Sequence, residues 1–241
     1  MKDNAIEIRG LAKRYRDVQA VDNFSMDVHR GELLSLLGVN GAGKTTLIGM
    51  LSGVIMPDSG DAQLLGHSIM SDVHAAKRRV SVSPQESAVA PRLTVKENLC
   101  LMAEIYGCGR NEARRRAEET IAEFGMEAIR DKYAGKLSGG WQRRLSIAMA
   151  LISRPEILFL DEPTLGLDVL ARRELWEMIH QLRGRVTIVM TTHYLEEAEA
   201  LSDRIAVMRS GRLVNAGTAQ ELMALAGKDN FEDAFVALST Q

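Results

Sequence analysis

One short segment constrains the fold of this 241-residue chain more than any other: the glycine-rich run GVNGAGKT at Gly38–Thr45. The apolar run LLSLL precedes it, and KTTLIGML, which has helical periodicity, follows it. A buried strand, a glycine loop and a helix, in this order, begin a mononucleotide-binding α/β unit. We therefore expect an α/β protein in which this loop ends a strand of a mainly parallel sheet.

The loop fits the pattern G-x-x-x-x-G-K-[ST] and has a third glycine at Gly41. Backbone N–H groups and the N-terminus of the following helix hold phosphates in such loops. Lys44 would reach the β- and γ-phosphates, and the Thr45 hydroxyl would bind Mg²⁺. The chain is therefore predicted to bind a nucleoside triphosphate. The predicted contact residues in the loop are Gly38, Val39, Asn40, Gly41, Ala42, Gly43, Lys44, Thr45 and Thr46.

Two further apolar runs end in polar side chains. ILFLDE ends at Asp161 and Glu162, and VTIVMTTH ends at His193. At the carboxyl edge of the sheet, Asp161 would hold Mg²⁺, often through water, and Glu162 would polarise an attacking water. His193 would contact the γ-phosphate or that water. The alternatives are a solvated pair of acids and a structural histidine, and the nearby glycine loop favours the catalytic interpretation.

The order of the patterns predicts a single domain, residues 1–241, with an insertion. Alternation in AIEIRG and VDNFSMDVHRGE predicts an antiparallel β region at the N-terminus. The remaining parts are a nucleotide-binding α/β core (residues 1–87 and 137–222), an inserted α-helical subdomain (88–136) and a helical tail (223–241). The tail could pack on its own domain or contact a partner.

Helix signals support the insertion. Thr94 and Glu97 match a capping box, and Asn111 is predicted to cap a second helix. A further capping box is expected at Thr218 and Glu221, near the tail. One face of the first inserted helix is expected to carry Leu99, Met102 and Tyr106.

Composition narrows the class of protein. Thirty basic and 32 acidic residues give a formal charge of -2, so no basic excess supports a nucleic-acid partner. Cys100 and Cys108 lack a nearby histidine cluster, which suggests neither a zinc site nor a disulfide framework. The N-terminus is polar, and no apolar run approaches membrane-span length. We expect a cytoplasmic chain that reaches a membrane only through a partner.

A second phosphate-binding turn lies far from the first. LSGGW, at residues 137–141, is a Ser-Gly-Gly turn that leads into a helical pattern. Such a backbone can hold a phosphate at a helix N-terminus. One nucleotide site would not need both turns.

In this order, the motifs resemble those of the ATP-binding subunit of an ABC transporter, from about Ile6 to Leu222. The resemblance assigns the Q-loop to Gln85, the signature to Leu137–Gly140 and the D-loop to Leu165–Asp168. It implies a P-loop NTPase (RecA-like) fold that binds ATP and Mg²⁺.

The resemblance also implies what each motif residue does. Tyr15 would stack on adenine. His193 would be the switch histidine, and Gln85 would link the γ-phosphate to a groove for a membrane partner. The implied catalytic residues are Lys44, Gln85, Glu162 and His193, and the implied Mg²⁺ ligands are Thr45, Gln85 and Asp161.

A site split between two chains is implied as well. ATPase subunits of this kind pair head to tail, so Ser138, Gly139 and Gly140 would close on the ATP of a second ATPase subunit. One copy of each motif leaves open a homodimer or a homologous partner. A separate integral membrane permease would dock in a groove around Ala88–Val95, which would hold the chain on the cytoplasmic face of the cell membrane.

PTLGLD and TTHYLEEAE are most similar to the ATPases of ABC-2 type exporters. The alternative is a soluble ABC-type ATPase that acts on ribosomes or DNA. Such relatives usually carry two ATPase units, a long coiled-coil insertion or zinc motifs, and this sequence has none of them. A kinase that shares only the glycine loop would not explain Gln85, LSGG and His193 together, and no Asn-Lys-x-Asp motif supports a GTPase.

One position departs from the family pattern. Gln most often follows the two glycines of the signature, whereas this chain has Trp141, with Gln142 next. The indole either packs across the interface between subunits or fills space at a tolerant position.

Overall fold

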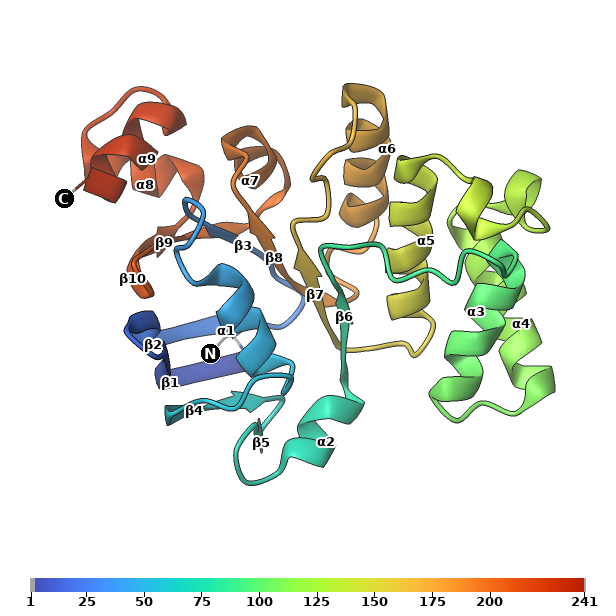
Figure 1. The fold of residues 1–241 in the computed structure, drawn as a ribbon. Coiled ribbons are helices and arrows are strands. Elements are labelled where there is room, and N and C mark those ends of the chain that lie inside the picture. Colours follow the sequence, from blue (N-terminus) through green and yellow to red (C-terminus); the bar gives the residue numbers. More distant parts are fainter. Residues whose placement is uncertain (1–2, 241) are drawn as a thin grey trace.

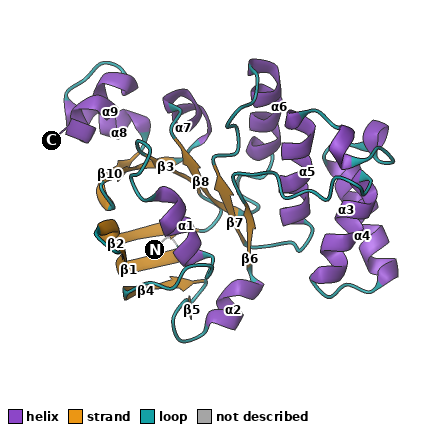
Figure 2. Ribbon diagram, in the orientation of Figure 1, coloured by secondary structure: helices purple, strands orange, loops and turns teal. Residues whose placement is uncertain are grey.

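The computed structural model describes residues 3–240, which form two β-sheets surrounded by helices (Figures 1 and 2). The smaller sheet is antiparallel, with the order β2-β1-β4-β5. On β1, an inner strand of this sheet, buried Ile6 and Ile8 lie on either side of the more exposed Glu7. The predicted N-terminal antiparallel region is therefore confirmed. Its strands are β1 (Asn4–Tyr15), β2 (Val18–His29), β4 (Ser59–Leu64) and β5 (His67–Ser68).

The larger sheet has the order β10-β9-β3-β8-β7-β6, and only the β9–β10 pair is antiparallel. Every residue of β3, β7 and β8 is buried. Both faces of these strands are covered, which explains their continuous apolar runs. The strands are β3 (Leu33–Leu37), β6 (Val80–Ser83), β7 (Ile157–Asp161), β8 (Thr187–Thr192), β9 (Arg204–Arg209) and β10 (Arg212–Gly217).

The parallel arrangement brings distant loops together. Strands β6, β7, β8 and β3 are consecutive neighbours that run in the same direction, so the segments after them leave the sheet at one edge. These segments contain Gln85, Glu162, His193 and the loop Gly38–Thr45. The predicted P-loop NTPase core, with a mainly parallel sheet, is confirmed.

Helix α1 (Lys44–Leu51) joins the two sheets. Its Leu47 and Met50 share one buried cluster with Leu11 of the smaller sheet and Leu36 of the larger sheet. The other helices that lie close to the core are α2 (Val73–Arg78), α6 (Val169–His180) and α7 (Leu195–Leu201).

The segment between β6 and β7 is mainly helical. It contains α3 (Val95–Ile105), α4 (Arg110–Glu123), two short 3-10 turns, η1 (Glu127–Ile129) and η2 (Ala134–Lys136), and α5 (Gly139–Leu151). Their apolar faces join α6 and one face of the larger sheet in a second buried cluster. Helices α3 and α4 lie at the opposite end of the molecule from the C-terminal helices (Figure 1).

The C-terminal tail packs on its own chain. Helices α8 (Ala219–Ala226) and α9 (Phe231–Thr240) bury Leu222, Phe231 and Leu238 in a third cluster that includes residues of β3 and β9. No helix within residues 3–240 combines the length and the apolar character needed to cross a membrane.

Of the predicted helix caps, two are confirmed and one is wrong. The capping box at Thr94 and Glu97 is confirmed, as is the one at Thr218 and Glu221. The predicted Asn111 cap is wrong, because α4 begins at Arg110 and its N-cap is Gly109, two residues before the predicted cap. Helix α3 ends at Ile105, so Tyr106 is its C-cap and is 47% exposed, whereas Leu99 is buried.

Candidate nucleotide site

The glycine loop follows β3 and turns sharply into α1. Gly43 has φ of 99°, and a Cβ built on it would lie 2.1 Å from the carbonyl oxygen of Ala20. At Gly38, a Cβ would lie 2.5 Å from the carbonyl oxygen of Met208. Only glycine avoids both contacts, because the loop passes directly against backbone from β2 and β9. The loop therefore presents backbone rather than side chains to the space in front of it.

Lys44 folds back over this loop. Its Nζ donates hydrogen bonds to the carbonyl oxygens of Gly38, at 2.6 Å, and Val39, at 3.2 Å. Burial lowers the pKa of Lys44, and the nearby carboxylates of Glu162 and Asp161 partly offset that effect. The ammonium group is thus held beside the loop, at the place where a phosphate would need a cation.

Asp161 is the centre of a small hydrogen-bond network at the end of β7. Thr45 donates its hydroxyl to Asp161 Oδ1 at 3.3 Å, and Thr191 donates to the same oxygen at 2.5 Å. The hydroxyl of Thr191 in turn accepts the backbone N–H of Glu162 at 2.9 Å. Thr191 thus links the two adjacent acids, and the prediction from sequence missed it. Its signal was a threonine near the end of a strand that is buried throughout.

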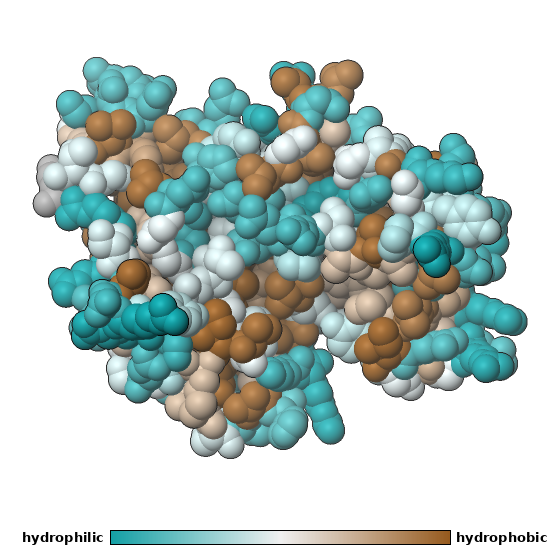
Figure 3. Space-filling view, in the orientation of Figure 1, coloured by the Kyte–Doolittle hydropathy of each residue, from teal (hydrophilic) through white to brown (hydrophobic). Residues whose placement is uncertain are grey.

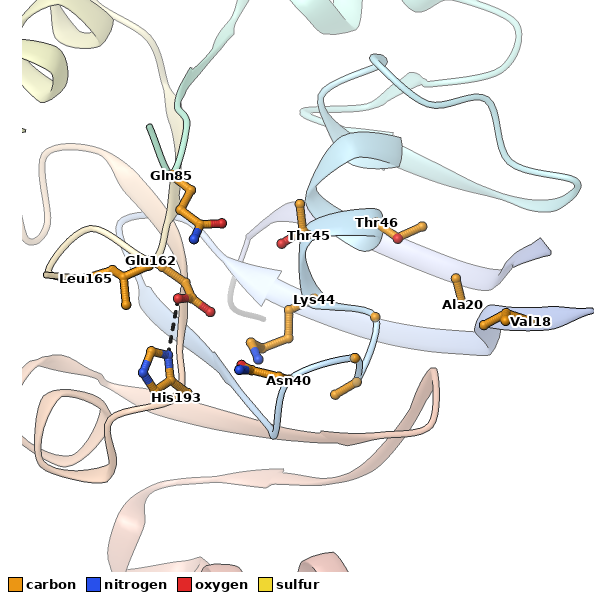
Figure 4. A pocket seen from close by; sticks show the side chains of 13 residues that line it. Val18, Ala20, Asn40, Lys44, Thr45, Thr46, Gln85, Glu162, Leu165 and His193 are labelled. Carbon is orange, nitrogen blue, oxygen red and sulfur yellow. Dashed lines mark ion pairs between the residues drawn. The ribbon is translucent and has the colours of Figure 1, made fainter. Parts of the chain in front are cut away.

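Glu162 and His193 face each other across the same edge (Figure 4). Glu162 Oε2 lies 3.2 Å from His193 Nδ1, a distance that allows an ion pair when the ring is protonated. The backbone of Glu162 has φ of 45°, in the left-handed region, where a non-glycine residue is strained by about 1–3 kcal/mol. Strain of this kind is typical of residues held in place for function.

A cavity of about 540 Å³ lies in front of these groups. It brings together residues from the glycine loop, the Q-loop, the ends of β7 and β8 and the hairpin after β1. Val18, Ala20 and Leu165 were not predicted as site residues, and they line it without contributing charged groups. The lining residues are Val18, Ala20, Asn40, Gly41, Ala42, Gly43, Lys44, Thr45, Thr46, Gln85, Glu162, Leu165 and His193.

Several predicted residues do not line this cavity. Tyr15 is 44% exposed, and Lys13 Nζ lies 5.7 Å from the centre of its ring. Its strand partner is Val18, which does line the cavity. Ser138, Gly139 and Gly140 also lie outside it; Ser138 instead caps α5 by accepting the N–H of Trp141.

Trp141 packs within its own chain. The Arg144 guanidinium lies 4.2 Å from the centre of the indole, a cation–π contact, and the ring packs against the second buried cluster. Arg144 also donates a hydrogen bond to Glu174 at 3.1 Å. These contacts describe Trp141 within its own chain, and packing across the interface between subunits stays a prediction.

The donor set suits a magnesium nucleotide. The loop offers backbone N–H groups and one ammonium, and Thr45 and Asp161 offer hard oxygen ligands that already touch each other. Within residues 3–240 no cluster of three or more His, Cys, Asp or Glu side chains could hold a metal alone. Mg²⁺ is commonly held by one or two protein oxygens together with substrate phosphates and water, so this sparse set fits it.

The fold and the site identify this protein as a P-loop NTPase. Asp161, Glu162 and His193 lie at the carboxyl edge of its parallel strands. The chain belongs to the ABC transporter family, whose family model matches residues 21–165. It is an ATP-binding subunit that hydrolyses ATP.

Individual relatives are also ATP-binding subunits of ABC transporters or ATP-binding proteins named for resistance or export. The chain is 41% identical to the daunorubicin resistance ATP-binding protein DrrA3 of Streptomyces coeruleorubidus, over 96% of this chain and 74% of the relative. It is 43% identical to the Nod factor export ATP-binding protein I of Burkholderia thailandensis, over 90% of this chain and 72% of the relative. A solved ATP-binding subunit of an ABC transporter matches with a TM-score of 0.84 and 28% identity, covering 97% of this chain and 99% of that one. CbiO1 from Clostridium perfringens matches with a TM-score of 0.84 and 27% identity, covering 92% of each chain.

Proposed function

We propose that this chain is the ATP-hydrolysing motor subunit of an ABC-2 type exporter. The single observation that carries the proposal is the close set of Lys44, Glu162 and His193 around one cavity, with the signature turn outside it. Relatives at 41% and 43% identity are named for daunorubicin resistance and Nod factor export, which supports an export direction. The transported compound is set by the membrane partner.

Within the site, each group has a distinct task. Lys44 and the loop N–H groups bind the phosphates of ATP, and Thr45, Asp161 and Gln85 would hold Mg²⁺, which would neutralise part of the phosphate charge. The carboxylate of Glu162 accepts a proton from the attacking water. His193 lies beside that carboxylate and stabilises the charge of the γ-phosphate. Adenine packs near Val18 and Ala20, with Tyr15 at the edge of the same hairpin.

The missing side of the cavity comes from a second ATPase subunit, either a second copy or a homologue. Ser138, Gly139 and Gly140 form the N-terminus of α5, where free N–H groups suit a phosphate, but they do not line this chain's own cavity. Exposed apolar side chains beside the D-loop, including Leu165, Val169 and Leu170, would be covered in the dimer. ATP then joins the two chains, and its hydrolysis releases them.

A separate integral membrane permease binds the helical side of the molecule. Brown side chains gather over the C-terminal end of α3 in Figure 3, where Leu101, Ile105 and Tyr106 are exposed. The segment Ala88–Val95 leads from Gln85 to the N-terminal end of the same helix, so both ends of α3 would take part in the docking. Docking there places the chain on the cytoplasmic face of the cell membrane, and no nucleic acid takes part.

The test is a pull-down from detergent-solubilised membranes of the native host. Tagged Glu162→Gln protein with ATP and Mg²⁺ should retain a chain with several membrane spans, near one-to-one with the ATPase. The double variant Glu162→Gln/Ser138→Arg, which cannot close the dimer, is the matched control for dependence on ATP. Recovery of ribosomal or DNA-bound proteins, with no membrane chain, would contradict the exporter and favour the soluble ATPase.

A further inference from the structure

Arg143 carries a charge in the interior of the protein. It lies in α5, five residues after Ser138, and only 4% of its surface is exposed. Burial lowers the pKa of Arg143 to about 10, while the charges of Asp161 and Glu197 act in the opposite direction. The guanidinium is therefore protonated at neutral pH, with all of its N–H groups available as donors.

Backbone carbonyl oxygens accept all of its hydrogen bonds. Nε donates to Pro163 at 2.8 Å, and Nη2 donates to Asp161 at 2.7 Å. Nη1 donates to Gln85 at 3.0 Å and also to Pro84. The guanidinium thus contacts the carbonyls on both sides of Glu162 and the carbonyl of Gln85 itself. These two loops end the neighbouring strands β7 and β6.

Two further polar contacts connect β6 with α5 and with the segment just after it. The hydroxyls of Ser83 and Ser146 lie 3.1 Å apart, and those of Ser81 and Ser153 lie 3.0 Å apart. Ser146 is three residues from Arg143, on the same face of the helix. The strand that leads to Gln85 is therefore held against α5 at Ser83 and against the segment after α5 at Ser81, and Arg143 makes the contact nearest the site.

We propose that Arg143 is a positioning residue for ATP hydrolysis, whose guanidinium fixes the backbone of Gln85 relative to that of Glu162. This inference rests on the proposed function, because it requires Gln85 and Glu162 to act on bound ATP. Helix α5 begins at the signature turn, which in the proposed dimer binds the ATP of the partner subunit. The same helix carries Arg143, which contacts the loops that act on this chain's own ATP.

Arginine is suited to this task in a way that lysine is not. The planar guanidinium presents five N–H donors in a fixed arrangement, whereas an ammonium is a compact group on a flexible stem. Lysine at position 143 would keep the charge, but its single ammonium group could not donate to the carbonyls of the Gln85 loop and the Glu162 loop at the same time. Methionine would keep much of the volume and remove every donor.

The experiment compares the full-length variants Arg143→Met and Arg143→Lys with wild type. It measures kcat, KM, nucleotide Kd and hydrogen–deuterium exchange. Because small misplacements of reacting groups cost up to about 100-fold in rate, Arg143→Met should lower kcat about 10-fold or more and leave the nucleotide Kd within about 3-fold. Exchange should become faster in residues 84–90 and 161–166 but not in residues 38–46. Arg143→Lys should give intermediate values.

Ser153→Ala is the matched control, because it removes a polar contact between the segment just after α5 and the same strand, at the end far from the site. It should leave kcat and exchange in both loops unchanged. A folded Arg143→Met protein with kcat within about 3-fold of wild type, or with unchanged loop exchange, would overturn the inference. If Arg143→Met does not fold, Arg143→Lys is judged by the same criteria. The variant Glu162→Gln, measured in parallel, separates the proposed function from the role of Arg143. Hydrolysis at the wild-type rate by Glu162→Gln would overturn the proposed function. In that case the exchange rates of the two loops in Arg143→Met would still test the role of Arg143.

Discussion

Glu162 and His193 lie side by side because they follow two neighbouring strands in register. Asp161 of β7 pairs with Thr191 of β8, and the chain turns immediately afterwards on both strands. As a result, Glu162 Oε2 comes within 3.2 Å of His193 Nδ1, an atom that is buried without a hydrogen-bond partner among the described residues. The two side chains that the proposed hydrolysis requires thus meet at one edge of the sheet, with one ring nitrogen of His193 turned toward the carboxylate of Glu162.

Replacing Glu162 by Gln should stop hydrolysis without preventing ATP binding. Gln keeps the shape of the side chain but cannot accept the proton of the attacking water, so the rate should fall by about 10²–10⁴-fold. Phosphate release and binding of a fluorescent ATP analogue measure the two effects separately. Glu196→Gln, an exposed acid in α7, is the control and should hydrolyse ATP normally. Equal loss of binding and hydrolysis in Glu162→Gln would contradict the role of a general base.

Gly43→Ala should destabilise the protein strongly. The substitution combines a left-handed φ of 99° with a Cβ placed 2.1 Å from the Ala20 carbonyl oxygen, so we expect a loss of about 3 kcal/mol or more. Gly41→Ala is a matched control, because its φ is 82° but no atom lies within 4 Å of the added Cβ. Its loss should stay near about 1 kcal/mol. Similar unfolding free energies for the two variants in urea would show that the contact with Ala20 is unimportant.

Glu197 should make stability depend on pH. Its side chain is fully buried in α7, Trp176 donates a hydrogen bond to it at 3.1 Å, and burial raises its pKa above the ordinary value of 4.5. Between 4.5 and the raised value the folded state binds more protons than the unfolded state, so this residue's contribution to stability falls as pH rises.

Glu197→Gln removes that titration. The free energy of unfolding of the variant, relative to wild type, should therefore increase as pH rises above 4.5, by up to about 1.4 kcal/mol for each unit by which the pKa is raised. Urea unfolding at a series of pH values measures this difference. Glu199→Gln, an exposed acid in the same helix, should show no such trend. A difference that is constant with pH, or that decreases, would contradict the assignment.

Local sequence patterns predicted which side chains lie together at the carboxyl edge of the larger sheet. The glycine loop, Glu162 and His193 each follow an apolar run, and the ends of parallel strands meet at one edge. Lys44 belongs to the same glycine-loop pattern, whereas Gln85 was assigned only through the resemblance to the family. Local geometry was less predictable: Asn111 is a good capping residue, yet α4 begins at Arg110 because Gly109 already has the extended backbone of an N-cap.

Residues whose importance depends on tertiary contacts were missed. Arg143 sits beside Arg144 in a polar stretch, and nothing local distinguishes the buried arginine from the one that stacks on Trp141. Glu197 follows Glu196 in the same way, although only Glu197 is buried. Helical periodicity indicates which side a residue faces, but a polar face of this kind becomes interior only when another element covers it.

The central claim is that ATP is held between two chains. Size exclusion with light scattering on Glu162→Gln protein, at millimolar ATP and Mg²⁺, tests it most directly. The account predicts a species of twice the 26.6 kDa chain mass, and a monomer when Ser138→Arg is added to the same chain. A monomer of Glu162→Gln under these conditions, or a dimer that persists with Ser138→Arg, would contradict it.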